Sequence, residues 1–149
     1  MAKIDPKSIF DSAESFYLGA KIIFKSAEKQ MIDPQSTTFQ LPILPCIINM
    51  SFSLELYLKF LLEIEKINKT RTHEIAILYN KLPNNIKGKV SNNVRSYQEF
   101  EDSLKEISNA FEEWRYDYEK EKLSIDIDKI NKAITIFRDL IIKIHPEWL

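Results

Sequence analysis

The chain has 149 residues, 44% of them hydrophobic and two of them glycine, and its formal net charge is −1 at pH 7. This length predicts one domain over residues 1–149, and the apolar content suffices for a core without metals or disulfides. The scarcity of glycine disfavours all-β folds and glycine-rich phosphate loops, and the near-neutral charge gives no overall attraction to nucleic acid.

Cysteine content and hydropathy bear on the compartment. The single Cys46 excludes an intramolecular disulfide, as is typical of a reducing environment. The charges within the first six residues do not match a signal peptide, and prolines and charged residues interrupt the apolar run Leu41–Leu62, which disfavours a membrane span. We therefore expect a cytoplasmic protein with no membrane partner.

Apolar residues recur at three- and four-residue steps through most of the chain, which predicts helices. The expected helices, in chain order, cover Ser8–Met31, Pro42 or Pro45 to Glu65, His73–Leu82, Phe100–Tyr118 and Ile125–Ile144. The weakly patterned stretch Asn84–Ser96 is either a loop or one short helix. No segment has the two-residue alternation of a half-buried strand, so we predict an all-α antiparallel bundle of about five helices.

Three local features of these helices are also expected. The inward stripe of the first helix includes Phe16, and that of the last helix extends to Ile144. The segment Cys46–Leu62 is predicted to be the buried spine of the bundle. Thr70 and Thr72 are candidate N-caps for the third helix.

The charges are unevenly distributed along the chain. Seven basic residues and one acidic residue lie between Lys66 and Arg95, whereas nine acidic and three basic residues lie between Ser96 and Glu121. The basic part is either a solvated helix face or a local patch that binds phosphates. In the second interpretation Lys87 and Lys89 bind nucleic acid.

Three segments occur in a distinctive order. They are Asn49-Met-Ser-Phe-Ser-Leu-Glu-Leu-Tyr-Leu-Lys-Phe-Leu-Leu, then Thr72-His-Glu-Ile with Leu82-Pro83, then Phe111-Glu-Glu-Trp-Arg-Tyr-Asp-Tyr-Glu. From Asn49 to Glu119 they span about half of the chain. They resemble the Glu-Leu-x-Leu-Lys, Thr-His-Asp-Leu and Trp-Arg-Tyr-x-Tyr-Glu segments of the HEPN family (higher eukaryotes and prokaryotes nucleotide-binding domain).

The resemblance implies a helical bundle that forms a homodimer. Catalytic members of the family are metal-independent ribonucleases with an Arg and a later His separated by four to six residues, and other members are binding or regulatory modules. The implied ligands are RNA or a nucleotide, with an antitoxin as one kind of protein partner. The implied setting is bacterial defence or a toxin–antitoxin-like role.

The last predicted helix offers Arg138 and His145 as candidate catalytic residues. Six residues separate them and a polar residue follows the Arg. Seven positions are nearly two turns, so both side chains project from nearly the same side. The guanidinium could hold a phosphate while the imidazole moves a proton, as metal-free RNA cleavage requires. Alternatively, His145 only complements the helix dipole.

Arg115 has no His in the corresponding window. Arg115 and Tyr116 are candidates for nucleic-acid binding, through a phosphate contact and base stacking. Alternatively, Arg115 pairs with Glu119 or Glu55, and Tyr116 packs in a dimer seam.

The remaining soft ligands are few. His73 is expected to be structural, and with only two histidines and one cysteine in the chain we expect no metal site and no cofactor. Two functions stay open. The first is a HEPN-like homodimer that binds or processes RNA, acting as a metal-independent endoribonuclease if it is an enzyme. The second is a non-catalytic helical module for dimerisation or interaction.

Overall fold

The computed structural model describes residues 3–31, 43–67, 72–116 and 127–148, and within them the secondary structure is helical with no strand. This confirms the predicted all-α class. The helices are α1 (Pro6–Met31), α2 (Ile43–Ile64), α3 (Ile75–Asn80), α4 (Asn84–Ser91), α5 (Tyr97–Tyr116) and α6 (Ile127–Ile144), followed by the 3₁₀ turn η1 (Pro146–Trp148). None of these helices is both long enough and apolar enough to cross a membrane.

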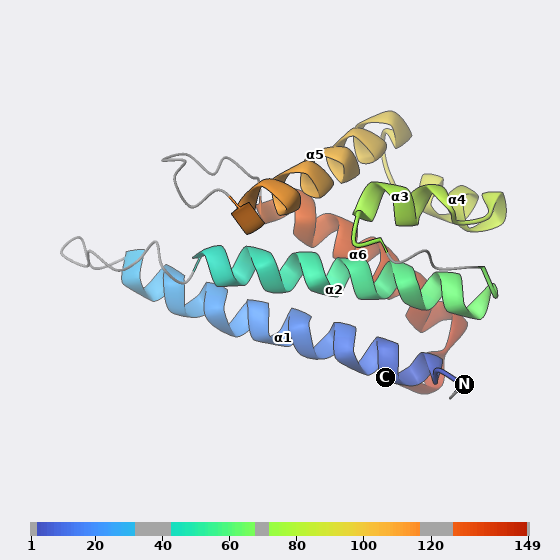
Figure 1. Cartoon of the computed structure of the whole chain (residues 1–149), viewed down its shortest axis with the longest axis horizontal. Coiled ribbons are helices and arrows are strands. Elements are labelled where there is room, and N and C mark those ends of the chain that lie inside the picture. Colours follow the sequence, from blue (N-terminus) through green and yellow to red (C-terminus); the bar gives the residue numbers. More distant parts are fainter. Residues whose placement is uncertain (1–2, 32–42, 68–71, 117–126, 149) are drawn as a thin grey trace.

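Helices α1 and α2 form an antiparallel pair that runs the length of the molecule (Figure 1). Small side chains of α2 bond directly to the backbone of α1, since Ser53 Oγ donates to the Ala13 carbonyl at 2.9 Å and Cys46 Sγ to the Ala20 carbonyl at 3.3 Å. Both the hydroxyl and the thiol are buried, so these bonds also give each buried donor an acceptor.

Helix α2 is the spine of the bundle, as predicted. It lies between α1 and a second group made of α3, α5 and α6 (Figure 1). Because it contacts helices on both sides, it is apolar around most of its circumference. Its buried apolar residues are Cys46, Ile47, Met50, Leu54, Tyr57, Leu58, Phe60, Leu61 and Leu62.

The segment after α3 folds as the short helix α4, so the helical alternative for this stretch holds. Pro83 precedes the helix with an extended ψ of 158°, and Ile86 and Val90, one turn apart, are buried. A single pair of apolar residues suffices here because α4 packs on α6.

The predicted cap of α3 is wrong. The helix begins at Ile75, with Glu74 as its N-cap residue and no side-chain cap. Thr72 Oγ instead accepts the backbone N–H of Glu74 at 3.1 Å, just before the helix. Thr70 lies outside the described residues.

Two residues predicted to face inward are exposed. On α1 the buried positions include Phe10 and Tyr17, whereas Phe16 is 39% exposed and lies against Phe52. At the other end of the chain Ile144 is 38% exposed, because α6 ends there and the chain turns into η1.

Candidate functional site

Arg138, the predicted phosphate-binding residue, forms a two-pronged ion pair with Glu14 of α1. Its Nε donates to Glu14 Oε1 at 2.7 Å and its Nη2 to Oε2 at 3.1 Å. The hydroxyl of Tyr57, a fully buried residue of α2, also donates to Glu14 Oε1. One carboxylate therefore joins α1, α2 and α6.

The electrostatics of this group favour the charged pair. Burial raises the pKa of Glu14, but hydrogen bonds from Arg138 and Tyr57 outweigh it and the net pKa is lowered. Burial and the neighbouring Glu14 raise the pKa of the Tyr57 hydroxyl, so Tyr57 stays protonated and donates. Hydrogen bonding to Glu14 raises the pKa of Arg138 as well. The guanidinium is thus charged and already paired.

His145, the predicted acid–base residue, belongs to an aromatic cluster. Its ring stacks on Trp148 with centroids 4.1 Å apart and planes within 6°, and it meets the ring of Phe60 nearly edge-on. Its Nδ1 lies 2.9 Å from Glu147 Oε1. The η1 turn folds Trp148 back against Phe10 as well, with ring centroids 5.2 Å apart.

Arg138 belongs to α6, whereas His145 follows directly after its last residue, Ile144. Arg138 contacts Glu14, and His145 contacts Phe60 of α2. Seven residue steps along a helix correspond to about 10 Å. Each side chain has its own set of partners, and no hydrogen bond joins the two within the described residues.

The other predicted binding residues have different outcomes. Arg115 and Tyr116 fall at the end of α5, and their side chains lie outside the described residues. Lys87 donates to the Asn80 carbonyl at 2.8 Å and lies over the ring of Tyr79 at 5.7 Å. Lys89 lines a hollow between α4 and α6.

His73 pairs with the buried Glu55 of α2, the carboxylate considered above as a partner for Arg115. Glu55 Oε1 lies 2.7 Å from His73 Nδ1 and accepts from Lys59 Nζ at 2.6 Å. The His73 side chain is 56% exposed, whereas Glu55 Oε2 is buried and has no hydrogen-bond partner among the described residues. The pair attaches the start of α3 to the spine, which agrees with a structural role for His73.

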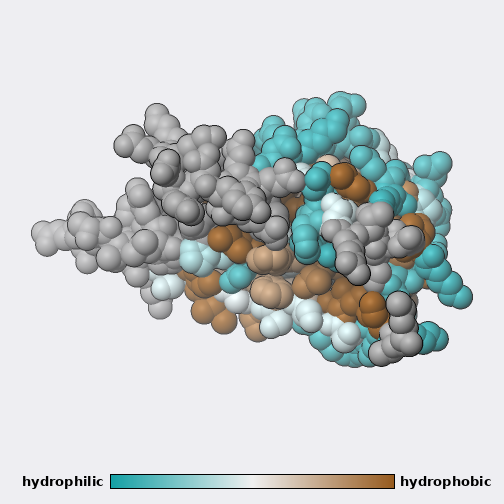
Figure 2. Space-filling view, viewed as in Figure 1, coloured by the Kyte–Doolittle hydropathy of each residue, from teal (hydrophilic) through white to brown (hydrophobic). Residues whose placement is uncertain are grey.

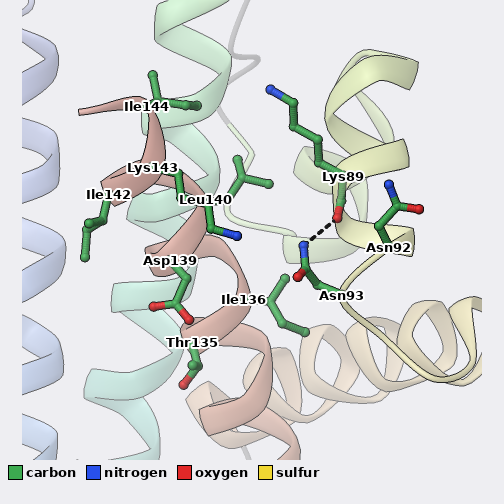
Figure 3. A pocket seen from close by; sticks show the side chains of 10 residues that line it. All are labelled: Lys89, Asn92, Asn93, Thr135, Ile136, Asp139, Leu140, Ile142, Lys143 and Ile144. Atoms are coloured by element: carbon green, nitrogen blue, oxygen red, sulfur yellow. Dashed lines mark hydrogen bonds between the residues drawn. The ribbon is translucent and has the colours of Figure 1, made fainter. Parts of the chain in front are cut away.

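A hollow of about 630 Å³ lies between α6 and α4 (Figure 3). Lys89, Asn92 and Asn93 line one side, and the Asn93 amide donates to the Lys89 carbonyl at 2.8 Å. Helix α6 lines the other side with the residues Thr135, Ile136, Asp139, Leu140, Ile142, Lys143 and Ile144.

A second hollow of about 750 Å³ continues along α6 toward the start of α5. The two hollows share Asn93, Thr135 and Ile136, so together they form one groove, called here the α6 groove. Its basic residues are Lys89, Arg95, Lys129, Lys132 and Lys143, and its acidic residues are Glu99 and Asp139.

Most of these groove residues were not predicted as binding residues. The basic segment between Lys66 and Arg95 was a usable signal for Lys89 and Arg95. Lys132 and Lys143 lie in α6, for which the sequence predicted only the apolar stripe and the catalytic candidates Arg138 and His145. Their charge becomes relevant only because α4 and α5 pack beside them.

No group of three His, Cys, Asp or Glu side chains within the described residues could hold a metal ion. Comparison with models of protein families, with curated proteins and with solved structures finds no match to this chain. The likeness to the HEPN family therefore rests on the sequence segments alone.

Proposed function

We propose that this protein is a HEPN-like helical module that acts by binding partners rather than by turning over a substrate. The observation that supports this is the Arg138–Glu14 pair. A guanidinium that already holds a carboxylate through two donors offers an incoming phosphate little net charge, and Glu14 repels it. His145 is likewise engaged by Trp148 and Glu147.

The test is an RNA cleavage assay with the purified chain in a chelator. Single-stranded and structured RNAs are incubated with the wild type and with Arg138→Lys and His145→Asn. We expect no cleavage above that of a buffer control by any of the three proteins. Cleavage by the wild type that both variants abolish would overturn the proposal, provided that circular dichroism shows both variants folded.

The second candidate is the homodimeric protein that binds or processes RNA, implied by the HEPN resemblance. The observation that favours it is an apolar surface on α1 and α2, visible as a brown band in Figure 2. Four large apolar side chains of α1 are 37% to 61% exposed, namely Phe16, Leu18, Ile22 and Phe24. Leu18 and Ile22 are four positions apart, so their exposed side chains lie side by side on the helix. Exposed apolar patches are typical of interaction sites.

Analytical ultracentrifugation tests whether a second copy covers this surface. We expect a dimer for the wild type and a monomer for Leu18→Asp with Ile22→Asp. The exposed polar residue Ser15 of the same helix provides the control, since Ser15→Asp adds a charge without removing apolar surface. Cleavage of RNA by the dimer and not by the monomeric variant would favour the ribonuclease. If the wild type sediments as a monomer, the homodimer hypothesis is excluded.

A further inference from the structure

We infer that the α6 groove docks an acidic amphipathic helix of a partner protein. This inference rests on the proposed binding function and names the class of partner. The groove carries three features that together specify such an occupant: an excess of positive charge, an aliphatic floor and a length of several helical turns.

The first feature is an excess of positive charge, since five basic and two acidic residues line the groove. Lys89, Arg95, Lys132 and Lys143 are all exposed, and none has a carboxylate partner within the part of the chain that the structure describes. These cations come from α4, the segment after it, and α6. The groove thus presents positive charge on both sides, and it complements an acidic ligand although the whole chain has a net charge of −1.

The second feature is the aliphatic floor. Ile136 lines both hollows, and Leu140, Ile142 and Ile144 continue the surface along α6. Aliphatic surface of this kind receives the Leu and Ile side chains of a helix laid into a groove. Proteins that hold single-stranded nucleic acid add exposed aromatic rings on which bases stack. Among the described residues lining this groove the only aromatic ring is Phe100, which is 8% exposed. The floor therefore favours a peptide over RNA.

The third feature is the length of the groove. Lys132 and Lys143 are eleven positions apart on α6, which corresponds to about 16 Å along the helix axis. A docked helix with anchors at positions i, i+4, i+7 and i+11 spans the same distance. Its acidic residues can then flank the anchors and meet the lysines at both ends.

The two acids of the groove add selectivity. Asp139 lies between Lys132 and Lys143 in the sequence of α6, and Glu99 lies at the start of α5. An occupant that is acidic along its whole length would place carboxylates beside them, which is unfavourable. The preferred partner therefore carries acids near its ends and a polar or basic residue near its middle.

The full chain is immobilised as the target, and binders are selected from a randomised phage-displayed library of helical peptides of about 15 residues. We expect the enriched sequences to combine Leu, Ile or Phe at helical spacing with Asp or Glu. The affinity of a synthetic copy, measured by fluorescence anisotropy, should fall by about tenfold in Lys132→Glu with Lys143→Glu and also in Ile136→Ser. The exposed lysines Lys25 and Lys105, outside the groove, provide the control as Lys25→Glu with Lys105→Glu.

The outcomes separate this inference from the proposed function. Enriched peptides without acids, or peptides whose affinity is the same in the groove variants, would overturn the inference and leave the binding function in place. A labelled single-stranded RNA whose binding falls in the same variants would overturn it as well, because the occupant would then be nucleic acid. A separate assay tests the proposed function. RNA cleavage that depends on Arg138 and His145 would contradict that function, whatever binds in the groove.

Discussion

The Arg138 side chain reaches from α6 to α1 and binds both carboxylate oxygens of Glu14, which lies 124 residues earlier in the chain. Farther along the same pair of helices, the Tyr17 hydroxyl of α1 donates to Asn131 Oδ1 of α6 at 2.7 Å. Long polar side chains therefore bridge α1 and α6. Both helices pack mainly on α2, so these bridges fix the position of one outer helix relative to the other.

The first prediction concerns the stability that Arg138 provides. Arg138→Met keeps a long apolar stem but removes the charged donors, so the Glu14 carboxylate loses two of the three hydrogen bonds that the described residues make to it. We expect the free energy of unfolding, measured by urea denaturation, to fall by about 1.5 to 3 kcal/mol. Lys132→Met on the same helix is the control, because Lys132 is exposed and should change stability by less than about 0.5 kcal/mol. Equal effects of the two variants would contradict a stabilising Arg138–Glu14 pair.

The second prediction is a pH dependence that arises from Glu14. Its pKa in the folded protein lies below the ordinary value of 4.5. Burial raises this pKa, but the hydrogen bonds from Arg138 and Tyr57 lower it by more. The unfolded chain therefore binds this proton more readily than the folded one. The stabilisation is fully present above about pH 4.5 and is lost as the pH falls through the lowered pKa.

Urea denaturation of the wild type and of Glu14→Gln, measured at neutral pH and in acid, checks this prediction. We expect the wild type to lose more stability on acidification than the variant does, since the variant has no carboxylate at this position to protonate. Contributions from the other carboxyl groups are common to both proteins. Parallel pH profiles would show that the Glu14 pKa is not lowered.

The third prediction concerns the aromatic cluster at the end of the chain. Trp148 stacks on His145 and contacts the rings of Phe10 and Phe60. Trp148→Ala removes these contacts and should lower the free energy of unfolding by about 2 to 3 kcal/mol. Glu147→Gln is the control. Because Glu147 is exposed, this change should lower the free energy of unfolding far less than Trp148→Ala does. A cost near zero for Trp148→Ala would mean that η1 does not pack on the bundle in solution.

Much of the fold could be predicted because each long helix contains its own periodic signal. The stripe from Ile130 to Ile141 on α6 is buried as expected, and the continuous apolar run of α2 is the spine. Helix α4 was ambiguous, since Ile86 and Val90 alone do not define a period. Phe16 was misassigned because the α1 stripe fits two adjacent faces, and packing on α2 selects the one that contains Tyr17.

The candidate site was harder to predict than the fold. The spacing of Arg138 and His145 is a local property, and His145 lies just beyond the last residue of α6. The spacing carries no information about Glu14 or Phe60, which reach the two residues only through tertiary packing. The α6 groove is similar in this respect, because Lys89 and Lys143 come together only when α4 docks on α6.

The last prediction concerns the end of α2, where Lys66 adopts a positive φ of 56°. The N–H of Ile67 donates to the Leu62 carbonyl at 2.9 Å and that of Lys66 to the Glu63 carbonyl at 3.0 Å, the paired bonds of a Schellman motif. The motif favours glycine at this position. The left-handed conformation destabilises a residue that has a Cβ by about 1 to 2 kcal/mol. Glycine avoids this penalty, but fixing its backbone on folding costs about 0.5 to 1 kcal/mol more conformational entropy. Lys66→Gly should therefore raise the free energy of unfolding by about 0.5 to 1 kcal/mol, measured by urea denaturation. Lys66→Ala removes the same side chain but keeps Cβ, so it should give no such gain, and equal stability of the two variants would refute the conformational explanation.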